Sequence, residues 1–93
     1  MKISYDEAKR RVTLEKRKLD FADVSKLFEG PHFSLLDDRR NYGEERFLSF
    51  GELNGRSVVV VWTWRDETRR IISMRHAHDE EIEARRRALE RLG

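Results

Sequence analysis

The chain has 93 residues, of which 41% are charged, yet its net charge is only +2 because 20 lysines and arginines face 18 aspartates and glutamates. This length allows one compact domain, residues 1–93, with a small core, and the near balance of charge excludes a polycationic tail. The absence of cysteine excludes disulfides and thiolate catalysis and agrees with a reducing cytoplasm. No apolar run approaches the roughly 18 residues of a membrane helix, so we expect no membrane association.

A short strand and a helix are predicted at the start of the chain. Residues 2–5 alternate between polar and apolar side chains, as in an edge strand. Asp6 can cap the following helix, because its carboxylate can accept hydrogen bonds from the free amides of the first turn. Lys9 and Lys16 recur at helical spacing, so we expect this helix to carry a basic stripe beside an apolar one.

A second helix is predicted over residues 21–28, with Asp20 as its cap. Gly30 permits a left-handed turn after this helix, and Pro31 cannot continue it. The segment HFSLLD then predicts a strand, and the polar segment DDRRNYG that overlaps its end predicts a loop.

Three strand-like segments follow at residues 45–53, 56–64 and 69–75. Asn54–Gly55 is a strong signal for a hairpin, because both central positions of that turn require positive φ. These segments therefore predict antiparallel neighbours. The four consecutive valines of the middle segment are apolar on both faces, so this strand is expected at the centre of the sheet.

The last segment is predicted to form a helix that begins with Asp79 as its cap. Acidic residues lie at its start and arginines at its end, which complements the helix dipole. Glu81 with Arg85 and Glu83 with Arg87 have the spacing of ion pairs. We therefore interpret its arginine cluster as a solvated, self-paired face. No helix combines a basic face with helix-turn-helix geometry, so duplex DNA binding by the chain alone is not expected.

The order of these elements predicts an α+β fold with a short N-terminal strand and two helices, an antiparallel sheet and a C-terminal helix, in which the helices pack on one side of the sheet. Several segments, in this order, resemble the BrnT family of bacterial toxins over nearly the whole chain. They are ISYDEAK at 3–9, LEK at 14–16, GEERF at 43–47, VVVVWT at 58–63, Arg65, and RIISMR at 70–75 with Ala77.

This resemblance implies a RelE-like fold and a toxin that cleaves RNA and inhibits translation. It also implies a cognate BrnA-type ribbon-helix-helix antitoxin that neutralises the toxin in a hetero-oligomer. Operator DNA would be bound only through that antitoxin. No cofactor is implied, and the three histidines of the chain are too few and too poorly spaced to suggest a metal site.

RNA cleavage without a metal requires a base for the 2′-hydroxyl, cations for the charge on the phosphorane-like transition state, and an acid for the leaving 5′-oxygen. Arginine suits the second task, because its planar fork pairs two phosphate oxygens and stays charged. The candidate catalytic cations are Arg46, Arg65, Arg70, Arg75 and Lys16, and the candidate substrate-binding residues are Lys9 and Arg17.

Strand parity limits how these arginines can combine. With a two-residue period, Arg70 and Arg75 lie on opposite faces of the last strand unless one of them is at a bulge or strand end. We favour Arg65 and Arg75 as the phosphate ligands, brought into one pocket by folding. Arg46 could equally be held by a neighbouring glutamate, and Arg70 could equally form an edge salt bridge.

The chain also departs from the family pattern, in which a histidine and a glycine are usual at positions 17 and 18. The missing imidazole leaves the proton carrier open, and His76, next to Arg75, is a hypothetical replacement. The alternative for His76 is that it only leads into the last helix. A second function therefore stays open, that of a catalytically weakened relative acting as a binding module or co-repressor with its antitoxin. The departures are Thr13, Arg17, Lys18 and Arg85.

Overall fold

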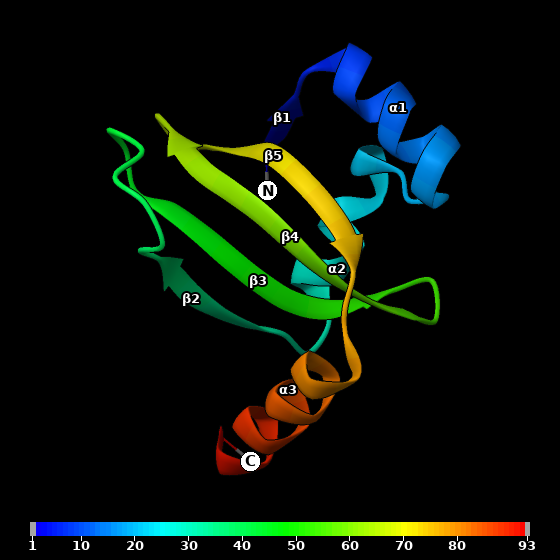
Figure 1. Cartoon of the computed structure of the whole chain (residues 1–93), viewed down its shortest axis with the longest axis vertical. Coiled ribbons are helices and arrows are strands. Elements are labelled where there is room, and N and C mark those ends of the chain that lie inside the picture. Colours follow the sequence, from blue (N-terminus) through cyan, green and yellow to red (C-terminus); the bar gives the residue numbers. More distant parts are fainter. Residues whose placement is uncertain (1, 93) are drawn as a thin grey trace.

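A computed structural model describes residues 2–92 and shows an α+β fold (Figure 1). Five strands form one sheet, three α-helices lie around it, and a single 3₁₀ turn precedes the second helix. In chain order the elements are β1 (Ile3–Tyr5), α1 (Glu7–Arg17), η1 (Phe21–Asp23), α2 (Val24–Glu29), β2 (Phe33–Asp37), β3 (Arg46–Leu53), β4 (Arg56–Arg65), β5 (Thr68–His76) and α3 (Asp79–Leu92).

The sheet has the strand order β1-β5-β4-β3-β2. Strands β2 to β5 are antiparallel neighbours, and β4 lies at the centre with Val58, Val59 and Val60 fully buried, as the sequence predicts. The sheet as a whole is mixed, because β1 pairs with β5 in parallel, and the expectation of a purely antiparallel sheet is wrong in this respect. No hairpin joins β1 to β5, so the turn geometry does not impose an antiparallel pairing on them.

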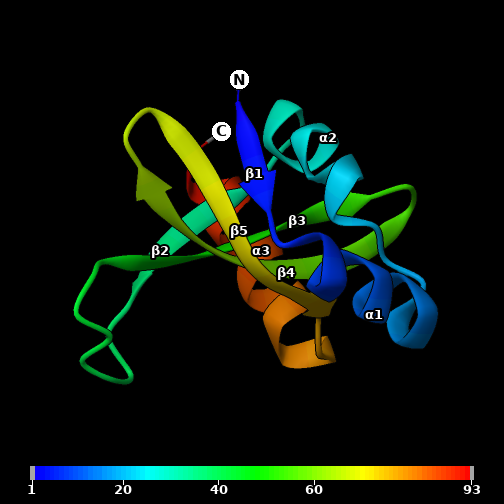
Figure 2. The ribbon, with the colours of Figure 1, turned by 90° about the horizontal axis from the view of Figure 1, so that it is seen from above.

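The two faces of the sheet are covered by different helices, so the expectation that all helices lie on one side is also wrong. On one face Phe21 and Leu27 pack with Val58, Val60 and Met74 in the main core. Val59 lies on the other face, because side chains alternate along β4. Its partner on β5, Arg75, lies on the same face and forms an ion pair with Glu81 of α3. Figure 2 shows α2 and α3 on opposite sides of the sheet.

A bulge in β5 decides which residues share a face. The pairing shifts between Val61 with Ser73 and Trp62 with Ile71, so that Ile72 has no partner on β4. A bulged residue reverses the two-residue alternation beyond it. Ile71 and Met74 accordingly lie in the same core although they are three residues apart. The parity assigned to Arg70 and Arg75 from the sequence is therefore wrong, and both lie on the face opposite this core.

The hairpin turn and the first helix cap form as predicted. Asn54 and Gly55 have φ values of 50° and 81°, as the tight turn between β3 and β4 requires. The Asp6 carboxylate accepts hydrogen bonds from the backbone N–H groups of Ala8 and Lys9 at 2.8 and 3.1 Å. These local signals fix the register of the hairpin and the start of α1.

Three predicted helix ends differ in detail. Asp20 caps η1 rather than α2, accepting a hydrogen bond from Ala22 N–H at 2.9 Å. Gly30 is extended, with φ −98° and ψ −177°, rather than left-handed, because a residue before proline is pushed towards extended conformations. Asp79 is the first residue of α3, and the carbonyl of His78 before it accepts the N–H of Ile82.

The ion pairs predicted within α3 are not those that form. Glu81 pairs with Arg75 of β5 rather than with Arg85, because the strand offers a bidentate partner. Glu83 pairs with Arg86, which also contacts Glu90. Charged side chains on the outer face of α3 thus form ion pairs with one another, as the sequence predicts, but these pairs involve Arg86.

Candidate functional site

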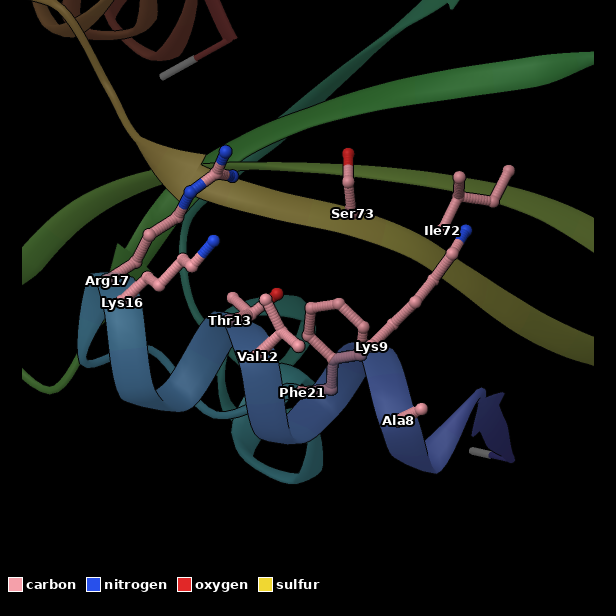
Figure 3. Close-up of a pocket in the computed structure, with 9 residues that line it drawn as sticks. All are labelled: Ala8, Lys9, Val12, Thr13, Lys16, Arg17, Phe21, Ile72 and Ser73. Atoms are coloured by element: carbon pink, nitrogen blue, oxygen red, sulfur yellow. The ribbon is translucent and has the colours of Figure 1, made fainter.

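A cavity of about 520 Å³ lies between α1 and β5 (Figure 3). Strand β1 pairs only with Ile71 and the two residues before it, so the edge of β5 beyond this point faces α1 instead of another strand. We call this cavity the α1–β5 groove. Its lining residues are Ala8, Lys9, Val12, Thr13, Lys16, Arg17 and Phe21, with Ile72 and Ser73 from β5.

The polar lining of the groove is cationic and hydroxylic, and it contains no carboxylate. Lys9, Lys16 and Arg17 extend from α1 toward β5, as Figure 3 shows. None of these three cations forms an ion pair with any carboxylate in residues 2–92. Arg10, one position after Lys9, is by contrast bound to Asp20, at 2.8 Å, and to Glu7. The groove is therefore suited to hold an anion.

Helical spacing explains why these side chains converge. Lys9, Thr13 and Lys16 follow one another at intervals of four and three residues, which places them on one face of α1. Lys9 and Lys16 are about 10 Å apart along the helix axis at a rise of 1.5 Å per residue. Ala8 and Val12 lie beside them, so the groove has an apolar surface between its charged ends.

Arg17 and His76 lie together at the end of the groove that the C-terminus of α1 forms. The Arg17 guanidinium donates a hydrogen bond to the Met74 carbonyl at 2.7 Å. His76 Nε2 lies 2.9 Å from the Arg17 carbonyl oxygen. His76 does not line the groove, whereas Arg17 does. The structure thus places the hypothetical replacement histidine next to position 17, but against its backbone.

Arg75 is held by α3. Its guanidinium donates two hydrogen bonds to the Glu81 carboxylate, both at 2.8 Å. This pairing lowers the pKa of Glu81 to about 2 and raises the pKa of Arg75. Arg75 is not among the residues that line the groove.

Arg65 and Arg46 share a different carboxylate. Glu44 accepts from Arg46 at 3.3 Å and from Arg65 at 3.5 Å. The Arg46 guanidinium also stacks over the Tyr42 ring, 4.1 Å from its centroid. Arg46 is therefore held by a neighbouring glutamate, which is one of the two alternatives left open for it.

The structure does not bring Arg65 and Arg75 together, which contradicts their expected role as ligands of one phosphate. Arg65 pairs with Thr68 beside the β4–β5 turn, whereas Arg75 pairs with Val59. The six residues from Val59 to Arg65 correspond to about 20 Å of strand. One phosphate cannot contact both guanidinium groups.

Arg70 remains as a cation near the groove. It pairs with Thr63 in the sheet, and the bulge at Ile72 puts it on the same face as Ser73, which lines the groove. Within residues 2–92 Arg70 forms no ion pair. The alternative of an edge salt bridge for Arg70 is therefore wrong.

Two polar residues of the groove, Thr13 and Ser73, were not selected as site residues from the sequence. Thr13 lies on the same helical stripe as Lys9 and Lys16, and this spacing could have identified it. Ser73 shares its face of β5 with Arg75, as simple alternation predicts, but no pattern in the sequence shows that this part of β5 faces α1. Across the described residues, no three histidine or acidic side chains cluster as a metal site would require. No helix in that range has the length and apolar character needed to cross a bilayer.

Comparison with known protein families gives a match over most of the chain. The family model described as "Ribonuclease toxin, BrnT, of type II toxin-antitoxin system" matches residues 5–81. No curated protein matches the chain. The matched segment begins in β1, ends in α3 and contains every residue that lines the α1–β5 groove.

Proposed function

Because the chain belongs to the BrnT family of ribonuclease toxins of type II toxin–antitoxin systems, we propose that it is a metal-independent endoribonuclease with a RelE-like fold that inhibits translation. The RNA backbone would bind in the α1–β5 groove. The observation that carries this assignment is that Lys9, Lys16 and Arg17 line one groove without any carboxylate, in a protein of nearly balanced charge.

Each of the three groove cations has its own proposed role in binding RNA. Lys16, beside Arg17 at one end of the groove, stabilises the charge that develops on the scissile phosphate. Arg17 binds the neighbouring phosphate, and Lys9 binds a phosphate further along the strand. In one strand of a duplex the phosphates are about 3.4 Å apart along the helix axis, so the roughly 10 Å between Lys9 and Lys16 would span about three such steps in a stacked strand. Thr13 and Ser73 can hydrogen-bond to phosphate oxygens or to the 2′-hydroxyl, the group that distinguishes RNA from DNA.

The proposed reaction is an internal transfer at phosphorus. The 2′-oxygen attacks the adjacent phosphate and the P–O5′ bond breaks, which leaves a 2′,3′-cyclic phosphate and a 5′-hydroxyl. The proton of the 2′-hydroxyl passes to solvent, and the leaving 5′-oxygen takes a proton. Lys16 is the lining residue that can donate this proton, because an ammonium group can act as a proton donor whereas the guanidinium of arginine does not release its proton.

The remaining arginines act outside this groove. Arg70, on the same face as Ser73 and without an ion pair in residues 2–92, extends the cationic surface beyond the groove. Arg46 and Arg65 form a second cationic site around Glu44 that contacts RNA at a distance from the cleavage point. Arg75, bound to Glu81, supports the sheet and α3 rather than a phosphate.

The partner is proposed to be a BrnA-type ribbon-helix-helix antitoxin in a hetero-oligomer, with operator DNA bound only through that antitoxin. An acidic segment of the antitoxin laid over Lys9, Lys16 and Arg17 would supply the carboxylates that the groove lacks and exclude RNA.

Cleavage of single-stranded RNA by the purified chain in the presence of a chelator tests this function. We expect products with cyclic phosphate and 5′-hydroxyl ends. Lys16→Ala should reduce kcat/KM by about 10- to 100-fold, the value of one hydrogen bond to a charged group. Lys26→Ala is the matched control, because Lys26 lies on α2 and pairs with Asp23. Cleavage that requires an added metal, or is unchanged in Lys16→Ala, would contradict the proposal.

A second candidate function is a catalytically weakened toxin that only binds RNA or its antitoxin. The observation that favours it is the absence of any histidine or carboxylate in the groove lining. In this case the chain would bind RNA, and Lys16→Ala would weaken that binding, but no cleavage products would form. Induction of the chain alone would then leave growth unaffected.

A further inference from the structure

Helix α1 forms one wall of the groove, yet none of its side chains is buried. Val12 and Leu14, its larger apolar residues, are 49% and 37% exposed. Burial of apolar surface is therefore incomplete along this wall, and it gives no fixed direction to the helix. Polar contacts at its two ends act together with it to fix where Lys9 and Lys16 stand relative to β5.

At the N-terminal half, the Arg10 guanidinium donates two hydrogen bonds to Asp20, at 2.8 and 3.2 Å. This contact ties α1 to the segment that enters η1. It does not reach β5, the opposite wall of the groove. The width of the groove is therefore set elsewhere.

At the C-terminal end, two hydrogen bonds join α1 directly to β5. Arg17 donates from its side chain to the Met74 carbonyl, and its own carbonyl faces His76 Nε2. A carbonyl oxygen only accepts, so Nε2 carries a proton and His76 donates. Met74 is fully buried in the core, which makes this part of β5 a fixed support. Ser73, a groove residue, lies directly before it.

We infer that His76 is a positioning residue for RNA binding, which holds the end of α1 against β5 and so sets the distance between the groove cations and Ser73. This inference rests on the proposed function of the groove. His76 acts through the Arg17 backbone and does not touch the substrate. It is therefore not the proton carrier that replaces the family histidine.

Two substitutions of His76 test the inference. His76→Ala removes the hydrogen bond to the Arg17 carbonyl, whereas His76→Gln places an amide N–H where Nε2–H was. The matched control is His78→Ala, a nearby exposed histidine whose backbone N–H, not its ring, contacts Glu81. The readouts are hydrogen exchange of the α1 amides, binding of a 2′-deoxy oligonucleotide that cannot be cleaved by this route, and the separate values of KM and kcat.

We expect His76→Ala to accelerate exchange in the last turns of α1 and to weaken oligonucleotide binding by about three- to tenfold, the value of one hydrogen bond. KM should rise by a similar factor while kcat and its pH profile stay unchanged. His76→Gln should restore binding and exchange, and His78→Ala should leave both as in the unaltered chain.

Other results would overturn the inference. Unchanged exchange and binding in His76→Ala would show that the contact does not position α1. A low kcat in both His76 variants, with normal binding and a lost limb of the pH profile, would instead identify a proton carrier. If the unaltered chain does not cleave RNA, the proposed nuclease function fails, while exchange and oligonucleotide binding still decide the role of His76.

Discussion

Lys18 ends α1 in a conformation that an ordinary side chain adopts at a cost. Its φ and ψ are 60° and 32°, and its backbone N–H donates to the Leu14 carbonyl at 3.0 Å. A left-handed residue other than glycine costs about 1–2 kcal/mol. Glycine, which the resemblance to the BrnT pattern leads one to expect at this position, adopts the left-handed conformation without this cost.

Lys18→Gly should therefore stabilise the protein. Relief of the left-handed strain exceeds the extra unfolded-state entropy of glycine, so we expect the free energy of unfolding to rise by about 0.5–1 kcal/mol. Urea denaturation with a fitted midpoint measures this change. Glu15→Gly is the control, since glycine inside α1 should lower stability by about 1 kcal/mol. Equal losses in both variants would show that position 18 carries no strain.

At the scale of elements, the Glu81 carboxylate connects β5 to α3. It accepts two hydrogen bonds from Arg75 and a third, at 2.8 Å, from the backbone N–H of His78. The last of these satisfies a free amide at the start of α3, as in one half of a capping box. One side chain thus both begins the helix and attaches it to the sheet.

This arrangement makes the attachment of α3 sensitive to acid. The Arg75 guanidinium lowers the pKa of Glu81 from its usual 4.5 to about 2. Because the folded-state pKa is the lower one, the stabilisation is complete above the unfolded-state pKa and is lost as pH falls from about 4.5 through about 2. We expect Glu81→Gln to be less stable than the unaltered chain at pH 6.

The difference in stability between Glu81→Gln and the unaltered chain should become smaller as the pH falls from about 4.5 to about 2. Thermal unfolding at a series of pH values measures it. Glu15→Gln, at a position without an ion pair in residues 2–92, should leave the pH dependence unchanged. A constant difference between Glu81→Gln and the unaltered chain at every pH would count against a charged Glu81–Arg75 pair.

At the scale of the whole molecule, function depends on where charges remain uncompensated rather than on their sum. The net charge is +2, and Arg10, Arg39, Arg46, Arg65, Arg75 and Arg86 each contact a carboxylate. The three groove cations do not. Anions should therefore be attracted to the groove, although the molecule as a whole is nearly neutral.

Salt dependence of RNA binding measures how many of these cations contact phosphate. For three contacts to a single strand, the logarithm of the binding constant should fall with the logarithm of salt concentration with a slope of about −2. Fluorescence anisotropy between about 50 and 200 mM salt gives this slope. Lys9→Ala should reduce its magnitude by about 0.7, and Lys26→Ala should not change it. A slope near zero would mean that RNA is not held through phosphates.

The fold was predictable where local chemistry decides it. The Asn54–Gly55 turn, the Asp6 cap and the central place of the valine-rich β4 all follow from interactions within a few residues. The bulge at Ile72, the parallel pairing of β1 and the opposite placement of α3 depend on distant partners. No local pattern in the sequence carries that information.

The same division applies to the candidate site. Helical spacing identified Lys9 and Lys16 correctly as neighbours on one stripe. The pairing expected for Arg65 and Arg75 failed because Arg65 lies at the turn of a hairpin, opposite Thr68, whereas Arg75 lies near the far end of the returning strand, opposite Val59. Hairpin geometry alone could have predicted that separation. The carboxylates that bind these arginines, Glu44 and Glu81, could be assigned only from the folded structure.

The absence of buried side chains on α1 has an evolutionary consequence. Substitutions along this helix can alter what is recognised without disturbing the hydrophobic interior, so ligand preference and folding are free to diverge separately. Thr13 and Arg17 lie on α1 and Lys18 caps it, so three of the four departures from the BrnT pattern occur there. Related chains should therefore differ most in specificity where their sequences differ along this one helix.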